Sequence, residues 1–323
     1  MTKSRTEQYF LSLFAVSSVA AAAEMAADLL RANSGFHTSA LPVDVFKLAE
    51  TKGLKIKQDL EGNGCSEGLL IPRKDDFLVR LKRDVATNRK RFSLAHELGH
   101  TFFYKDEGEG PRHAVGILDR TEHLAEERVC DEVAAFLLMP TGELKRRFDG
   151  LQEHQPSEIL RAMDSSSEVF SVSREALARH AEAVSLAIPP CLVLQSSFRE
   201  NPSGSEEKDL RTDWCAAIGS WEDRRRLWRH YRLSSIGLAS ACDLYHTWRD
   251  LSARGTYMFG SLGQLERDPK APRVCTEAVT VSVSSGGKWK ARTESFLTAS
   301  RLYSWDKPDG TVEARVLSVL TPC

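Results

Sequence analysis

Apolar residues recur at helical spacing near the start of the chain, where the apolar stretch from Tyr9 to Ala23 continues through Met25, Ala26, Leu29 and Leu30. This spacing predicts an amphipathic first helix. A second helix is predicted over residues 41–50, because Pro42 lies near its start and apolar residues follow on roughly one side. Short apolar runs between polar turns then predict strands at 54–56, 68–71 and 77–81, and therefore a small sheet.

The middle of the chain is dominated by helical spacing. It predicts helices over residues 91–104 and 121–139, with a Gly-, Glu- and Pro-containing loop at 105–112 between them. The second of these helices ends before Pro140, which cannot continue it. Shorter periodic segments at 143–148, 156–163 and 173–184 predict a small helical bundle.

The pattern changes after Pro189 and Pro190, where short strand-like segments take over. Strands are predicted at 191–195, 214–218, 278–283, 289–298 and 312–319, with a loop at 199–209 and a basic helix from Trp221. A chain of 323 residues also exceeds the usual size of one domain. We therefore predict an α+β protein with one domain over residues 1–188 and a second α+β domain over residues 189–323.

Composition and charge describe an ordinary globular chain and narrow the choice of partners. The hydrophobic share is 41% and the charged share is 28%, which is neither a disordered nor a fibrous composition. The 44 Lys and Arg residues balance 45 Asp and Glu residues, giving a formal net charge of -1. This balance excludes a bulk electrostatic attraction to nucleic acid, so any such binding requires a local patch.

Cysteine usage and the N-terminus bear on location. The seven cysteines are odd in number and lack the paired spacing of a disulfide framework, which indicates a reducing, cytoplasmic compartment. The N-terminal stretch imitates a secretory signal, with Lys3 and Arg5 ahead of an apolar run, but Glu7 interrupts the charged region. We favour a structural helix and no membrane association, and an exported protein stays the alternative.

The segment His96-Glu97-Leu98-Gly99-His100 has the HExxH pattern. On a helix, a spacing of four residues places both imidazoles on one face, where they can bind one zinc ion. Glu97 is then placed to act as the general base on a water molecule rather than as a ligand. A chance match is the alternative, but the apolar residues around the pattern give the helix a buried side.

A catalytic zinc site needs a third protein ligand and one open position. Glu127 is the best candidate because Asp131 follows one turn later on the same helical face. Asp131 can accept a hydrogen bond from a ligand histidine and fix its tautomer. Other carboxylates compete for the ligand role, namely Glu122, Glu126 and Glu132, although a solvated acidic face is the commoner fate of such residues.

These segments resemble the ImmA/IrrE family of metallopeptidases. The resemblance rests on residues 91–100, 127–131 and 136–140, and it extends to Pro42-Val43-Asp44 and Phe170-Ser171-Val172-Ser173, so it covers about residues 20–188. It implies a zincin-like peptidase domain with one zinc ion per chain. It also implies cleavage of a helix-turn-helix repressor in response to stress, DNA damage or a phage-related signal, and a sensory second domain that is GAF-like in some members.

The chain departs from the family pattern at three positions. Cys130 and Val133 stand where Ala and Phe are usual, and Tyr104 stands where a histidine is frequent. A group that stabilises the oxyanion is also required, and Tyr104, His113 and His123 are the candidates among which the sequence does not choose. Four other histidines show no ligand spacing and are predicted to be structural, namely His154, His180, His230 and His246.

Two further segments suggest regulation. Cys65 follows a Gly-rich loop and could occupy the open position of zinc as an inhibitory thiolate, although a half-buried structural thiol is the plainer interpretation. The basic helix carries arginines between aromatic residues, and we predict single-stranded DNA binding and activation through Arg225, Trp228, Arg229 and Arg232. The alternative is that the aromatic residues belong to the core and the arginines are solvated.

A different class of function also fits the fold, namely a catalytically inactive peptidase fold that binds a repressor or nucleic acid without cutting it. The presence of Glu97 beside both ligand histidines argues against this reading, because a binding protein needs no general base.

Overall fold

The computed structural model describes residues 3–33, 41–61, 67–106, 110–151, 155–184, 186, 188, 190–200, 208–219, 273–285, 288–306 and 312–322. The chain divides into two compact units. The first comprises Met1–Leu144 and Ser166–His180, and the second comprises Lys145–Ser165 and Ala181–Cys323. The domain boundary at residue 188 stays a prediction.

The N-terminal segment forms two helices where the sequence pattern predicted one. Helix α1 spans Arg5–Phe14 and α2 spans Val19–Asn33. Ala15 has a left-handed backbone conformation with a φ of 54°, so it ends α1 although the apolar spacing continues. Both helices contribute buried side chains, including Phe10 and Leu30, and therefore belong to the core of the first unit.

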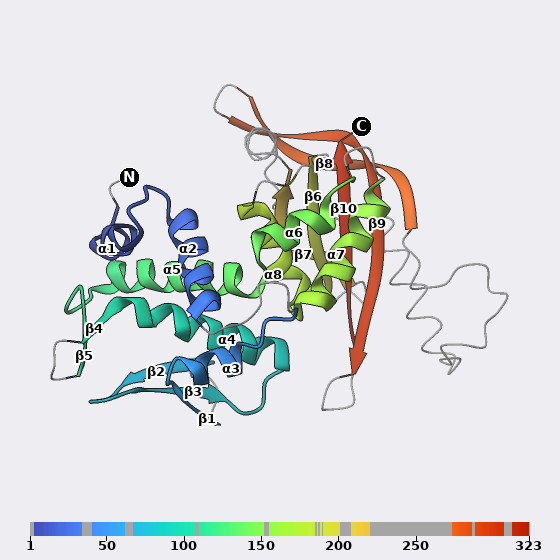
Figure 1. Ribbon diagram of the computed structural model, residues 1–323. Coiled ribbons are helices and arrows are strands. Elements are labelled where there is room, and N and C mark those ends of the chain that lie inside the picture. The colour runs from blue at the N-terminus through green and yellow to red at the C-terminus, as the bar shows by residue number, and fades with distance from the viewer. Residues whose placement is uncertain are drawn as a thin grey trace. The chain divides into compact units, whose positions relative to one another are not determined.

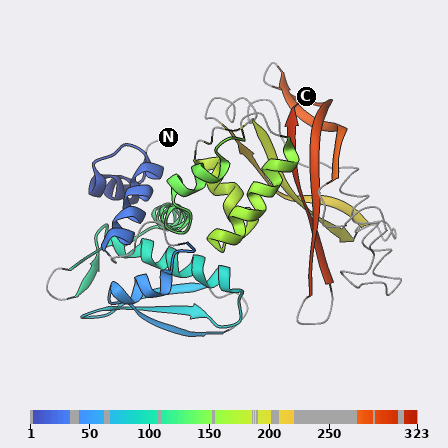
Figure 2. The ribbon, with the colours of Figure 1, turned by 45° about the vertical axis from the view of Figure 1, so that its right-hand side comes forward.

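A small mixed sheet lies next to the helices of the first unit (Figures 1 and 2). Its strands are β1 (Lys55–Leu60), β2 (Gly68–Pro72) and β3 (Phe77–Lys82), in the order β1-β3-β2. β3 pairs parallel with β1 and antiparallel with β2, which leaves β2 at one edge. The connection from β1 to parallel β3 therefore passes through the antiparallel edge strand. Helix α3 (Val45–Thr51), which precedes β1, begins at Asp44, whose side chain accepts a hydrogen bond from the Lys47 N–H.

Two helices that pack against each other follow the sheet, namely α4 (Thr87–His100) and α5 (Arg120–Leu138). α4 contacts β2 and β3 on one side and α5 on the other, as Figure 1 shows. Asp119 starts α5, since its carboxylate accepts hydrogen bonds from the N–H groups of Thr121 and Glu122.

The predicted loop at 105–112 is partly wrong. A 3₁₀ turn (Thr101–Phe103) follows α4, and the chain then forms a small antiparallel hairpin of β4 (Tyr104–Asp106) and β5 (Pro111–His113). The register pairs Tyr104 with His113, so this hairpin brings His113 back beside the end of α4.

Three further helices follow: α6 (Thr141–Phe148), α7 (Pro156–Phe170) and α8 (Arg174–Ala183). His180 on α8 is buried, and its Nε2 donates a hydrogen bond to the Met139 carbonyl at 2.8 Å. Burial lowers the pKa of His180 to about 4, which keeps the ring neutral. His180 is therefore a structural residue that satisfies a carbonyl at the end of α5.

The second unit contains a five-stranded antiparallel sheet with the order β7-β6-β10-β9-β8. Its strands are β6 (Cys191–Glu200), β7 (Lys208–Ile218), β8 (Arg273–Ser285), β9 (Lys288–Asp306) and β10 (Val312–Pro322). Each strand is longer than the sequence pattern predicted, and β6 and β7 extend into the predicted loop at 199–209. The predicted basic helix from Trp221 lies outside the described residues.

Within the described ranges, no single helix is long and apolar enough to span a membrane. α1 and α2 together have the length and apolar composition of a membrane span, although they are bent by 53° at their break. Several apolar side chains of α2 are fully buried in the protein, as expected for core helices.

Candidate metal centre

The site forms where α4 and α5 lie in close contact. A β-carbon added at Gly99 on α4 would lie 3.0 Å from the Cα of Cys130 on α5. The missing side chain at Gly99 therefore permits close contact between the two helix backbones. This contact brings the histidines of the HExxH segment against the acidic face of α5.

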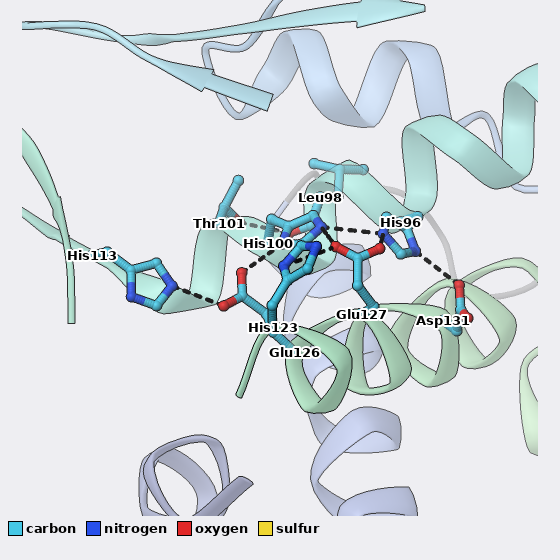
Figure 3. Close-up of polar contacts among 9 residues, drawn as sticks. All are labelled: His96, Leu98, His100, Thr101, His113, His123, Glu126, Glu127 and Asp131. Carbon is cyan, nitrogen blue, oxygen red and sulfur yellow. Dashed lines mark hydrogen bonds and ion pairs between the residues drawn. The ribbon is translucent and has the colours of Figure 1, made fainter. Parts of the chain in front are cut away.

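Three donor groups converge on one point (Figure 3). The Nε2 atoms of His96 and His100 are 3.1 Å apart. The Glu127 carboxylate lies between them, with Oε2 at 3.3 Å from His96 Nε2 and Oε1 at 3.4 Å from His100 Nε2. Donor atoms of a tetrahedral zinc site are about 3.3 Å apart, given metal–ligand distances of about 2.0–2.1 Å. The spacing of the three groups fits one zinc ion.

The outer nitrogens of both rings are fixed by carboxylates. His96 Nδ1 lies 2.8 Å from Asp131 Oδ1, and His100 Nδ1 lies 2.7 Å from Glu126 Oε1. Each Nδ1–H donates to its carboxylate, so a neutral ring directs the lone pair of Nε2 towards Glu127. Two lone pairs and a carboxylate at this distance repel one another unless a cation lies among them.

The pKa values of these groups also show that the site favours a positive charge. Burial opposes protonation of His96, but hydrogen bonds to Asp131 and Glu127 outweigh it and raise its pKa to about 9. Burial likewise opposes protonation of His100, yet the neighbouring Cys130, Glu126 and Glu127 raise its pKa. Hydrogen bonds from His100 and His96 lower the pKa of Glu127. The donor set is therefore suited to a divalent cation.

A second carboxylate contact extends the network to the β4–β5 hairpin. Glu126 is buried, and its Oε2 accepts a hydrogen bond from His113 Nε2 at 2.8 Å while its Oε1 accepts one from His100. The His113 ring stacks on Phe103 and contacts Tyr104 edge-on. Glu126 therefore links His100 to the hairpin through hydrogen bonds. The sequence left it open as a metal ligand, but it is not one of the three groups that converge.

A second donor set contains Cys130 in place of Glu127. One nitrogen of His96, one nitrogen of His100 and the sulfur of Cys130 lie within 4.8 Å of one another. Cys130 is fully buried, and burial raises the pKa of its thiol to about 12. Of the two sets, we favour the one with Glu127, because both of its oxygens are within 3.4 Å of the Nε2 atoms and it is ionised at neutral pH.

Glu97 lies next to the edge strand β2. It is buried, which raises the pKa of its carboxyl group, and it accepts a hydrogen bond from the Leu70 backbone N–H. A β-carbon added at Gly68 would lie 2.6 Å from Glu97 Oε1. The sequence did not reveal that Gly68 makes room for the predicted base.

The candidates for oxyanion stabilisation occupy different positions. His113 Nε2 is taken by Glu126, whereas His123 lies one turn before Glu127 on α5, with its Nδ1 3.7 Å from Glu127 Oε1 and its side chain 60% exposed. Tyr104 is half-buried, and burial followed by the nearby Glu126 raises the pKa of its hydroxyl. Cys65 and the segment with Arg225, Trp228, Arg229 and Arg232 lie outside the described residues.

The first unit combines an HExxH helix, a second helix that supplies a glutamate and an aspartate, and a small sheet. This arrangement is consistent with a peptidase domain. Residues 72–182 match the model of the Peptidase_M78 family, described as an IrrE N-terminal-like domain. Residues 72–182 are therefore similar to an IrrE N-terminal-like domain, and this match supports the predicted membership of the ImmA/IrrE family.

Among solved structures, a Mycobacterium tuberculosis transcriptional regulator is similar over 98% of this chain and 80% of that chain, with 12% sequence identity and a TM-score of 0.49. No curated protein sequence matches the chain.

Proposed function

We propose that this protein is a zinc-dependent endopeptidase in which His96, His100 and Glu127 hold one zinc ion per chain. The observation that supports this proposal is the convergence of two Nε2 atoms and one carboxylate within 3.4 Å, with both Nδ1 atoms tied to carboxylates. The family match supports it independently, because the family is one of peptidases.

The protein groups divide the chemistry among themselves. Glu97 accepts the proton of the attacking water and later delivers it to the leaving amine, a role that a carboxyl group with a raised pKa performs well. His123 faces solvent beside Glu127 and is our choice for the donor that stabilises the developing oxyanion. A bound zinc ion supplies Lewis acidity for the water and for the scissile carbonyl.

The substrate that we propose is a helix-turn-helix transcriptional repressor, as the family resemblance implies. The second unit would then carry the signal, and its five-stranded antiparallel sheet is compatible with a GAF-like sensor. We retain single-stranded DNA as the proposed activator, through Arg225, Trp228, Arg229 and Arg232, and we retain stress, DNA damage or phage-related signals as the triggers.

The experiment is to incubate the zinc-loaded protein with the helix-turn-helix protein encoded next to it, with and without a single-stranded oligonucleotide. We expect specific cleavage by the wild type and none by Glu97→Gln with the same zinc content. Tight binding of the repressor by both proteins without cleavage would identify an inactive binding protein instead. Rapid digestion of casein would contradict a narrow substrate range.

A further inference from the structure

Cys130 occupies a position next to both metal-facing histidines. Its sulfur lies within 4.8 Å of a ring nitrogen of each histidine, and its thiol is a hydrogen-bonding neighbour of His100. Its backbone is held against α4, because Gly99 between the two histidines has no side chain to keep it away. These contacts place Cys130 in the lining of the site, next to both histidines.

The helical geometry allows Cys130 and Glu127 to serve one ion together. They lie three residues apart on α5, a spacing that places two side chains on the same face. A nitrogen and a sulfur bound to one zinc ion are about 3.6 Å apart, given Zn–N near 2.0 Å and Zn–S near 2.3 Å. The present separations, all within 4.8 Å, are compatible with this spacing.

The chemistry of the donors also favours sulfur. Zinc binds thiolate in preference to most other protein ligands, and a fully buried cysteine beside two imidazoles has the environment of a zinc–sulfur site. We propose that Cys130 is a fourth protein donor, which closes the metal site together with His96, His100 and Glu127 when no substrate is bound. The inference rests on the metal site of the proposed function.

Binding of the Cys130 sulfur to the metal requires no oxidant. The S–H bond of Cys130 breaks, the proton passes to solvent and a metal–sulfur bond forms. Four protein donors leave no open position, so cleavage requires the sulfur to withdraw from the metal. Cys130 would thus restrain the peptidase in its resting state.

Cobalt(II) is the probe that tests the inference, because thiolate bound to cobalt gives a charge-transfer band in the near ultraviolet, separate from the visible bands of tetrahedral cobalt. The full-length, metal-free protein is titrated with cobalt under reducing conditions. We expect the wild type to show both sets of bands. Cys130→Ala and Cys130→Ser should lose the charge-transfer band and keep the visible bands, since His96, His100 and Glu127 remain.

Two matched variants assign the sulfur. Cys191→Ala removes another fully buried cysteine, in β6, and Cys65→Ala removes the cysteine that the sequence suggested as an inhibitory ligand. Both should keep the charge-transfer band. A wild type without the band, whether or not cobalt binds, overturns the inference, and so does a band that survives in both Cys130 variants.

Cleavage of the partner repressor separates this inference from the proposed function. If the protein cleaves the repressor in a Glu97-dependent way but shows no charge-transfer band, the sulfur ligand is refuted and the proposed peptidase function stands. If the protein shows a Cys130-dependent charge-transfer band but cleaves nothing, the proposed peptidase function is refuted and the sulfur ligand stands. If both ideas hold, Cys130→Ala cleaves the repressor faster than the wild type does.

Discussion

Gly68 lies so close to Glu97 that a β-carbon at this glycine would be 2.6 Å from Oε1 of the carboxylate. Gly68 belongs to the edge strand β2, and Glu97 also accepts a hydrogen bond from Leu70 in the same strand. The strand therefore fixes the position of the proposed base.

We expect Gly68→Ala to displace the Glu97 carboxylate and to lower the rate of repressor cleavage by about 100-fold, the usual cost of a misplaced catalytic group. Zinc content should not change, because the atoms nearest to the added β-carbon all belong to Glu97, which is not a proposed ligand. Gly142→Ala is the control, since nothing lies within 4 Å of the added β-carbon there. Equal loss of activity in both variants would contradict the explanation.

Removal of the base itself has a distinct signature. Glu97→Gln should lower the cleavage rate by roughly 10²- to 10⁴-fold, the contribution typical of general acid–base catalysis. Elemental analysis should still find one zinc ion per chain, because Glu97 is not a ligand in the proposed site. Activity within a few-fold of the wild type would refute the assigned role.

Glu126 should matter for metal affinity although it is not the assigned ligand. Glu126→Gln removes the carboxylate that orients His100, and outer partners of this kind change metal affinity by about 10- to 100-fold. His113→Ala removes the support of Glu126 from β5 and should weaken zinc binding in the same direction, by less. Competition with a chelator measures both.

The control for these variants is Glu132→Gln, which changes a half-buried glutamate on the same helix. It should bind zinc as the wild type does. A Glu126→Gln protein with unchanged zinc affinity would show that His100 is oriented by its own packing and not by the carboxylate.

The sequence predicted some parts of the site and not others. The common face of His96 and His100, and that of Glu127 and Asp131, follow from spacing within one helix. The contact between Glu126 and His100 depends on how α4 crosses α5, which Gly99 permits and no local pattern encodes. His113 enters through the register of a hairpin in a segment that was predicted to be a loop.

The fold shows the same division between local and non-local information. Helix α5 was predicted to within one residue at each end because its apolar spacing is long and regular. The helix predicted over 91–104 was displaced by four residues, since α4 spans Thr87–His100 and is followed by a 3₁₀ turn and a strand. The break between α1 and α2 was missed, because apolar spacing continues past Ala15 while the backbone there turns left-handed. The strands of the second unit are longer than predicted, since pairing with neighbours extends them beyond their apolar runs.

Glu122 should make the stability of the first unit sensitive to acid. Its carboxylate accepts hydrogen bonds from the side chain and backbone of Thr6 and from the Arg5 backbone, which lower its pKa to about 2. These bonds hold the start of α1 against α5. Because the folded-state pKa is depressed from its ordinary value of 4.5, the stabilisation is complete above about pH 4.5 and is lost as the pH falls towards 2.

Glu122→Gln should therefore lower the Tm at pH 7, and the difference from the wild type should shrink below pH 4.5. Glu132→Gln should behave in the opposite way, because burial raises the pKa of Glu132 and its ionised form opposes folding at neutral pH. This variant should raise the Tm at pH 7 and approach the wild type in acid. Thermal unfolding of the three proteins between pH 7 and pH 3 measures both trends, and parallel Tm curves for wild type and Glu122→Gln would exclude Glu122 as the acid-sensitive tie.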